Sequence, residues 1–517
     1  MNPESTNDTR GWWPLRKNRR KLLRAGTAAA AAVTLIPMIA ACGSPTADTG
    51  QIDSSLSGNE IADLTEQAFD WGLNIAGFYE LRHLYTQQDG PAFHGLNRLQ
   101  PQLELFNAKT SRVATTVNAS TLYSGGMFDL SKDPIVVETP AVTDGRYWSV
   151  QAGDQYADWF FKAGSQFSGN APQRYLLIGP DWHGKLPAGF TGTQIVRAPS
   201  DSFVLSARIA VTSRTDADMA AARAVVLGIG AVPLSQWTAA GGHIPALDQQ
   251  PKVKGDYRSF PRMDQITDIA KSMTALDYLH LLSLALNDPT LTRKADSAKE
   301  IQTLNGLARL GLKPGAIFDP DKIDADRRAK IDEGFTRART NARNAFTATQ
   351  IDMNGWRLQS DLFADPLDYR AKAGADDVAW GTPVPYQSHT IAYLFTDSGG
   401  RDLDGSHRYT LTFDTGTLPP TTEFWELPIY DSAGYFIDNP INRYSVTSGQ
   451  FASGAYTVTD GKLTFYLQPD PPTDPDQKRN WLPTPPKDHF QLAARFYGPT
   501  SGLLDGTYPM AKAVRTD

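Results

Sequence analysis

The sequence predicts a mainly β protein with an α-helical middle segment. The 517 residues include 42 glycines and 35 prolines, and they also include 11 tryptophans, 19 tyrosines and 23 phenylalanines. Many turns combined with many aromatic residues favour strands over a helical bundle. Short runs of alternating polarity fill residues 103–210 and return after Gly355, whereas residues 258–352 show helical spacing of apolar residues. The chain is too long for one domain, so two or three are expected.

The net charge of −6 is unevenly distributed. Residues 1–42 carry seven Lys or Arg and two acidic residues, so the remainder carries about −11. Nucleic-acid binding needs clustered Lys and Arg to neutralise phosphates. We therefore expect no nucleic-acid partner.

The N-terminus carries the most specific signal. Residues 18–24 (NRRKLLR) resemble a twin-arginine export motif, and the Ala-rich apolar run 25–41 is too short and too interrupted for a permanent membrane span. The run ends at Cys42, the sole cysteine, in a sequence that resembles a bacterial lipobox. We expect residues 1–42 to be a signal peptide and Cys42 to be lipidated, with residues 43–58 as a flexible tether. The alternative is a chance Ala-rich helix with a stray cysteine.

This interpretation predicts an extracytoplasmic protein that is anchored by lipid to the bacterial cell membrane. Acyl chains contribute about 0.8 kcal/mol per buried CH₂, so the two or three chains of a lipoprotein anchor it firmly. A twin-arginine route would export the chain folded, and the general secretory route stays open. Neither route requires a cofactor.

Residues 59–257 are predicted to form an N-terminal helix followed by a β domain. Apolar residues from Ile61 to Phe78 recur at steps of three and four, and Asn59 is the predicted helix cap. Four later segments read as strands with no helix between them, which favours an antiparallel sandwich. These segments are 134–140, 146–152, 175–179 and 203–211.

Residues 258–355 are predicted to be a helical linker or insert. Apolar residues at helical spacing mark helices within 262–287, around Leu307 and within 321–350, and a short helix is expected earlier, over 216–229. Breakers such as Pro289 and Pro314 separate them.

Residues 356–517 are predicted to form the C-terminal β domain. Strands are expected at 409–413, 462–468 and 490–497. Phe424 to Tyr444 predicts a strand, a turn at Asp431–Gly434 and a returning strand at Tyr435–Ile437. The proline-rich stretch 469–486 reads as a structured surface loop.

Two groups of short motifs resemble known bacterial families. NASTLYS at 118–124, DLS at 129–131 and RYWSVQ at 146–151 resemble the domain of unknown function 1254. The C-terminal half is similar to its partner domain, 1214. The resemblance implies two jelly-roll-like β-sandwich domains joined by helices, and it implies no reaction. The matching C-terminal stretches are LDG at 403–405, LPP at 418–420, FW at 424–425, IYD at 429–431, DNPINRY at 438–444, NWLP at 480–483 and FYGP at 496–499.

No motif assigns a metal or a cofactor. The eight histidines lie singly, without an H-E-x-x-H or H-x-H pattern. Two alternatives stay open, a zinc or iron site from His389 and His407 across a hairpin, and a calcium loop at 397–405. For the second, a solvated hairpin loop is the competing interpretation.

No nucleophilic catalytic motif is present. The G-x-S-x-G elbow is absent, and the only cysteine is assigned to lipid. Glu426, Asp431 and Asp438 could pair for glycoside cleavage, or they could cap turns and pair with Arg443. Whether the chain is an enzyme stays open.

The polar and aromatic corner around residues 424–444 supplies the candidate ligand-binding site. We expect the protein to bind or modify a small molecule, glycan or lipid. The alternative is a non-catalytic scaffolding or assembly lipoprotein, as a homo-oligomer through its sheet edges. The candidate ligand-binding residues are Asp431, Asp438, Asn439, Asn442, Arg443, Tyr444 and Trp481.

Overall fold

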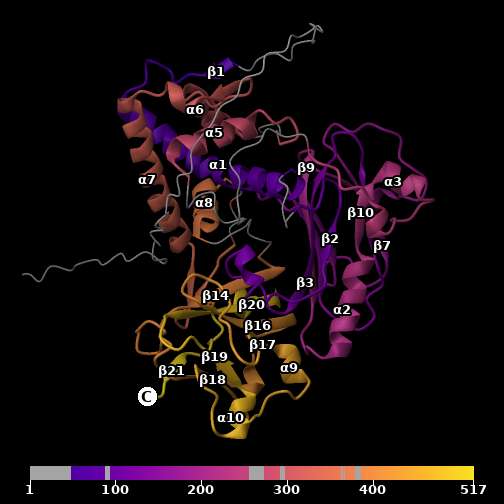
Figure 1. The fold of residues 1–517 in the computed structure, drawn as a ribbon, viewed down its shortest axis with the longest axis vertical. Helices are drawn as coiled ribbons and strands as arrows, with labels where there is room; N and C mark the ends of the chain where they lie inside the picture. The colour runs from indigo at the N-terminus through magenta and orange to yellow at the C-terminus, as the bar shows by residue number, and fades with distance from the viewer. Residues whose placement is uncertain are drawn as a thin grey trace, which may run out of the picture.

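The computed structural model describes residues 48–87, 93–255, 273–291, 297–361, 365, 367–378 and 386–517. The protein consists mainly of open β sheets, accompanied by helices. Figure 1 shows a group of helices at one end and two β units beside and below it. The predicted signal peptide, Cys42 and the first part of the tether lie outside the described residues. Within them, no helix is both long and apolar enough to cross a membrane.

The N-terminal β unit contains two packed sheets. Its core includes Phe128, Trp148 and Phe203, which are fully buried between the sheets. One sheet has the order β2 (Gln100–Gln102), β3 (Thr121–Asp129), β9 (Ser202–Ala210), β5 (Trp148–Gly153) and β6 (Phe161–Gly164). The other has the order β10 (Gly230–Pro233), β4 (Ile135–Thr139), β7 (Gln173–Ile178) and β8 (Ile195–Arg197), and helices α2 (Asp216–Gly228) and α3 (Leu234–Ala239) flank the unit.

The helical group joins the first helix to helices much later in the chain. Helix α1 (Gly58–Thr86) packs against α5 (Ala275–Leu286), α6 (Ala298–Arg309), α7 (Ala325–Ala348) and α8 (Tyr369–Val378). The crossing with α7 is close, because a Cβ on Gly334 would stand 2.2 Å from the carbonyl oxygen of Ala62. These helices share one apolar core.

The predicted helix cap is wrong by two residues. Ser57, rather than Asn59, caps α1, because the Ser57 hydroxyl accepts from the Glu60 amide. The Glu60 carboxylate accepts in turn from the Ser57 amide at 2.8 Å. This is a capping box, in which a serine and a glutamate three residues later satisfy one another's free amides.

The C-terminal β unit also contains two packed sheets. Its core includes Trp425, Leu427 and Phe465. One sheet has the order β12 (Ile351–Met353), β13 (Trp356–Leu358), β14 (His389–Leu394), β20 (Phe490–Pro499), β16 (Thr421–Asp431) and β17 (Ser445–Thr447). The other has the order β19 (Trp481–Pro483), β18 (Lys462–Gln468), β15 (Tyr409–Asp414) and β21 (Ala513–Arg515).

The region 424–444 is only partly as predicted. The turn is confirmed, because Asp431 Oδ1 accepts from the amides of Ala433 and Tyr435 and Gly434 has φ +84°. The returning strand at Tyr435–Ile437 is wrong. Strand β17 pairs antiparallel with β16 instead. The loop 469–486 likewise contains helix α10 (Pro475–Arg479) and strand β19.

Candidate functional site

The candidate site lies where the two β units face one another. Side chains alternate between the faces of a strand, so Tyr147 on the approach to β5 and Tyr497 on β20 can leave their own cores and meet. Their ring centroids are 4.8 Å apart. Phe424 of β16 stacks on Tyr497 at 4.2 Å, and the three residues form one buried cluster. We call the residues between the two facing sheets the inter-sheet layer. Those discussed below are Phe106, Tyr123, Tyr147, Arg208, Arg214, His389, Ile391, Tyr393, Glu423, Phe424, Glu426, Arg495 and Tyr497.

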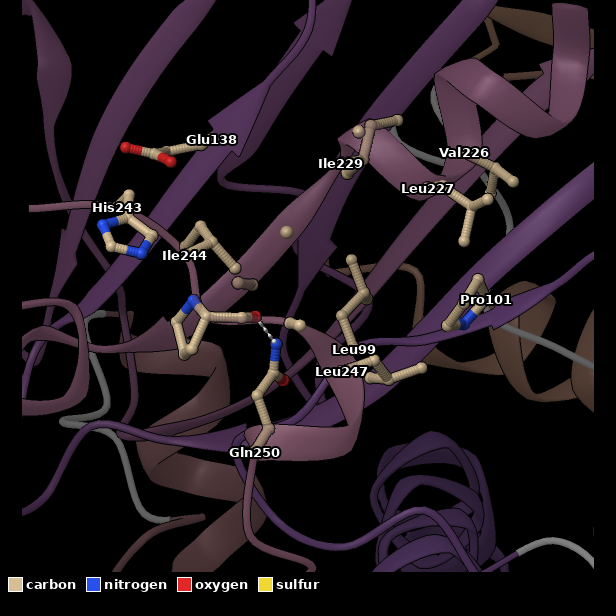
Figure 2. A pocket seen from close by; sticks show the side chains of 15 residues that line it. Leu99, Pro101, Glu138, Val226, Leu227, Ile229, His243, Ile244, Leu247 and Gln250 are labelled. Carbon is tan, nitrogen blue, oxygen red and sulfur yellow. Dashed lines mark hydrogen bonds between the residues drawn. The ribbon is translucent and has the colours of Figure 1, made fainter. Parts of the chain in front are cut away.

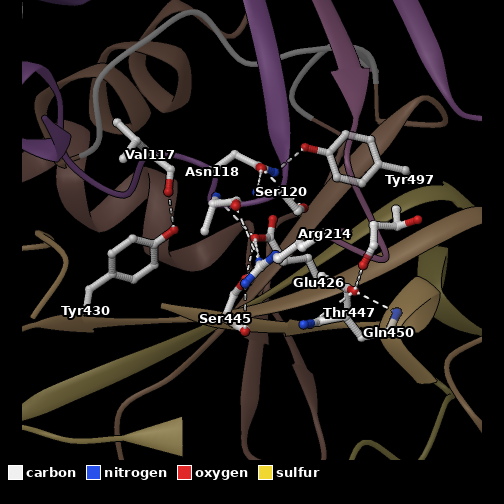
Figure 3. Close-up of polar contacts among 12 residues, drawn as sticks. Val117, Asn118, Ser120, Arg214, Glu426, Tyr430, Ser445, Thr447, Gln450 and Tyr497 are labelled. Carbon is white, nitrogen blue, oxygen red and sulfur yellow. Dashed lines mark hydrogen bonds and ion pairs between the residues drawn. The ribbon is translucent and has the colours of Figure 1, made fainter. Parts of the chain in front are cut away.

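Hydrogen bonds from one short segment join the units. Asn118 Nδ2 donates to the Tyr497 hydroxyl at 2.7 Å, and the Tyr430 hydroxyl donates to the Val117 carbonyl at 2.7 Å. The Ala119 amide donates to Glu426 Oε1 at 3.1 Å (Figure 3). The segment that precedes β3 therefore meets β16 and β20 of the other unit. This contact explains why an Asn stands at the start of the NASTLYS stretch.

Glu426 is a fully buried carboxylate in this layer. Its Oε1 accepts from the Ser445 hydroxyl at 2.7 Å and lies 3.8 Å from Arg214 of the N-terminal unit (Figure 3). Its Oε2 has no hydrogen-bond partner. The ion pair with Arg443, one of the alternatives for this carboxylate, is not found among the described residues; Glu426 lies beside Arg214 instead.

Two further arginines of the layer have only neutral acceptors. Arg208 on β9 donates to Gln151 Oε1 at 3.0 Å. Arg495 on β20 is only 7% exposed and donates to the Thr116 carbonyl, and its Nε has no partner. Among the described residues, no carboxylate forms an ion pair with either guanidinium. A buried cation without an ion pair is costly, so the environment of Arg495 calls for an explanation.

His389 lies on β14, the strand next to Arg495, and both arginines are near enough to affect its charge. Its ring is 4.4 Å from that of Tyr497, its exposure is 9%, and its Nε2 has no partner. Burial lowers the pKa of His389 well below its ordinary value, and Arg495 and Arg208 act in the same direction. The imidazole is therefore neutral at pH 7 and has one nitrogen available to a ligand.

The remaining wall of the layer is half-buried and largely apolar. Tyr123, Ile391 and Tyr393 are each partly exposed although they lie on the facing sides of the two sheets. Phe106 approaches Tyr123 at 5.9 Å, and the Arg208 guanidinium lies 5.8 Å from the Tyr123 ring. This wall combines flat apolar surface with cationic donors, a combination that suits recognition of a small molecule.

Most of the predicted ligand-binding residues form a corner beside the layer, and Tyr444 packs in the same cluster as Ile391 and Tyr393 of its wall. Asn439 accepts from the Arg443 amide at 3.0 Å, and Arg443 donates to the Trp481 carbonyl at 2.7 Å. Asn442 Oδ1 accepts from the Tyr444 hydroxyl at 3.0 Å. Tyr444 and Trp481 are buried, Asp431 caps its turn, and Asp438 is exposed. The corner satisfies its own hydrogen bonds, and its ligand-binding role stays a prediction.

The alternative metal sites find no support in the described chain. No group of three or more His, Cys, Asp or Glu residues there is arranged to hold a metal ion. His407 lies 3.4 Å from Asp517. Asp397 accepts from the amides of Gly399 and Arg401, so the 397–405 stretch is a capped hairpin loop.

A pocket of about 300 Å³ lies in the N-terminal unit, away from the layer (Figure 2). Glu138 and His243 stand at one end of it, and the rest of the wall is mainly apolar. Glu138 already accepts from Arg174 at 2.7 Å and from the Trp237 indole at 3.0 Å. The charge of Glu138 is thus used within the unit.

The sequence interpretation missed Arg208, Arg495 and the role of His389. The signal was present, because Arg208 and Arg495 each sit at a polar position of an alternating strand. Such positions ordinarily face water. Only the facing of two sheets from distant parts of the chain buries Arg495 and partly covers Arg208.

Comparison with known proteins agrees with the two-unit arrangement. Residues 96–233 match the family described as Protein of unknown function (DUF1254), and residues 388–501 match Protein of unknown function (DUF1214). No curated protein matches the chain. The crystal structure of the VPA0106 protein from Vibrio parahaemolyticus is similar in fold, with a TM-score of 0.61 and 22% identity over 88% of this chain and 100% of that one. An uncharacterised protein from Burkholderia cenocepacia aligns with a TM-score of 0.39 and 12% identity over 86% of each chain.

Proposed function

From a chain that combines a DUF1254 region with a DUF1214 region, we propose a lipid-anchored cell-envelope protein that binds a small molecule between its two β units. The observation that carries the proposal is the inter-sheet layer. His389 Nε2 and Arg495 Nε are buried there without partners. Buried polar groups in folded proteins are nearly always hydrogen-bonded, so unpaired donors and acceptors beside a half-buried wall favour a binding site.

The proposed location rests on the N-terminal sequence. A twin-arginine-like motif, an apolar run and a lipobox around Cys42 follow one another in the order that an exported lipoprotein needs. A Cys42→Ala variant tests this. We expect the wild type to stay with membranes after carbonate and salt washing and the variant to leave them. A variant that stays membrane-bound after both washes contradicts the lipid anchor.

The proposed topology of each β unit is the jelly roll. The support is that each unit contains two packed sheets with an apolar core between them. This architecture commonly places ligands between or beside its sheets, and the proposal for binding does not depend on it.

The competing proposal is a non-catalytic scaffold. The bonds from Val117, Asn118 and Ala119 to the other unit favour it, because they would hold the units together without any ligand. The two proposals differ in what the half-buried wall does. A scaffold would gain nothing from the partial exposure of Ile391, whereas a binding protein could use that surface.

A thermal-shift screen of small molecules on the full-length protein in detergent separates the two. Hits are then tested on Ile391→Trp, which adds bulk to the half-buried wall, and on Val514→Trp, which adds it to an exposed position of β21. We expect hits to shift the Tm of the wild type and of Val514→Trp, and not that of Ile391→Trp. A screen without hits favours the scaffold. Hits that still shift the Tm of Ile391→Trp refute the proposed location of the site.

A further inference from the structure

We propose that the inter-sheet layer selects a small organic carboxylate with a flat apolar body. This inference rests on the proposed binding function and specifies its ligand class. It starts from the charges of the layer rather than from its space.

Positive charge exceeds negative charge in the layer. Three arginines, Arg208, Arg214 and Arg495, face two carboxylates, Glu423 and Glu426. Glu426 is used by Arg214, and Glu423 accepts from Ser165 at the edge of the layer, where burial raises its pKa. With both carboxylates ionised, one positive charge remains in the layer. Glu426 faces Arg495 across the β16–β20 pairing as well as Arg214, and Arg208 forms no ion pair among the described residues. A monoanion would neutralise the remaining positive charge.

The unpaired donors suit a carboxylate. Arg495 Nε has no partner, and the Arg208 guanidinium donates a hydrogen bond to the neutral side-chain amide of Gln151. A guanidinium presents its N–H groups in a planar fork that matches the two oxygens of a carboxylate. His389 Nε2 is a second unpaired group, on the strand next to Arg495, and the neutral imidazole can donate from it.

The apolar part of the wall selects the body of the ligand. Tyr123, Phe106 and Tyr393 offer aromatic faces, and Ile391 adds an aliphatic surface. The Arg208 guanidinium already lies near the Tyr123 ring, so a flat ligand could place its carboxylate on the guanidinium and its body along the rings. Inorganic phosphate would use the charge and leave this surface wet.

The test compares three probes on the full-length protein in detergent: benzoate, benzyl alcohol and inorganic phosphate. We expect benzoate to bind most tightly, as measured by calorimetry. Arg208→Gln should weaken benzoate about tenfold or more, since a hydrogen bond to a charged group is lost. The matched control is Arg408→Gln, which removes an exposed arginine of the other sheet and should leave benzoate binding unchanged. Arg208→Lys keeps the charge without the fork and should fall between.

Three results overturn this inference. The first is that benzyl alcohol binds as tightly as benzoate. The second is that phosphate binds more tightly than benzoate. The third is that Arg208→Gln binds benzoate as tightly as the wild type does. If screening hits are blocked by Ile391→Trp but are all neutral, the binding site stands and the carboxylate preference fails. If Ile391→Trp blocks none of the screening hits, the proposed binding between the two β units fails, and this inference fails with it.

Discussion

The hydrogen bond between Asn118 and Tyr497 makes a quantitative prediction about how the two β units support one another. Asn118 is 1% exposed, donates to the Tyr497 hydroxyl at 2.7 Å and accepts from the Ser120 amide at 2.6 Å. Tyr497→Phe removes one bond and leaves Asn118 Nδ2 unpaired, which should cost about 1–2 kcal/mol. Asn118→Ala leaves both the Tyr497 hydroxyl and the Ser120 amide unpaired, so it should cost about 2–4 kcal/mol.

A double-mutant cycle isolates the bond between the units. The double variant should be less destabilised than the sum of the single variants, with a coupling of about 1 kcal/mol. Unfolding in urea is followed by tryptophan fluorescence and by far-UV circular dichroism. The matched control pairs Asn118→Ala with Tyr508→Phe, whose hydroxyl donates to Thr417 within the C-terminal unit, and should be additive. Additivity in the Asn118–Tyr497 cycle would refute the bond as a link between the units.

Three other predictions concern stability. Gly334→Val should lower the Tm markedly, because its side chain would meet the α1 backbone, whereas Gly192→Ala, with open space around it, should change the Tm little. Burial raises the pKa of Asp70 to about 6, so the stability of the wild type relative to Asp70→Asn should fall as pH rises from about 4 to 6; an unchanged difference across that range would contradict the burial effect. Burial lowers the pKa of His389, so the wild type should lose stability relative to His389→Asn as pH falls below about 6.5. If the difference between the denaturant midpoints of the two proteins stays constant with pH, this prediction is wrong.

Much of the fold could be predicted from the sequence. The strands at 409–413 and 462–468 stand out because one face of each packs on a core, and a half-buried strand shows its period. The strand at 490–497 shows the same alternation of apolar residues, although both of its faces are buried. The failed strand at Tyr435–Ile437 shows the limit of this reasoning. Its aromatic residues have strand propensity, yet Tyr430, Phe436 and Tyr444 stack on one another instead of pairing backbones.

The inter-sheet layer could not be predicted, because nothing local distinguishes it. Arg208 and Arg495 are separated by almost three hundred residues, and each would be a normal solvent-facing residue on a single exposed sheet. The corner at Asn439 and Arg443 attracted notice because its polar residues are adjacent in sequence. Local hydrogen bonds between Asn439 and Arg443 account for these polar residues without a ligand.

The position of β20 has a consequence for the order of folding. This strand is the last of its sheet in chain order, yet it lies between β14 and β16 in the middle of the sheet. The sheet therefore cannot close until residues 490–499 have been synthesised, and its pairings span long loops, which slows folding. Because β20 also carries Arg495 and Tyr497, a chain that stops short of it would lack both the centre of the sheet and one side of the inter-sheet layer.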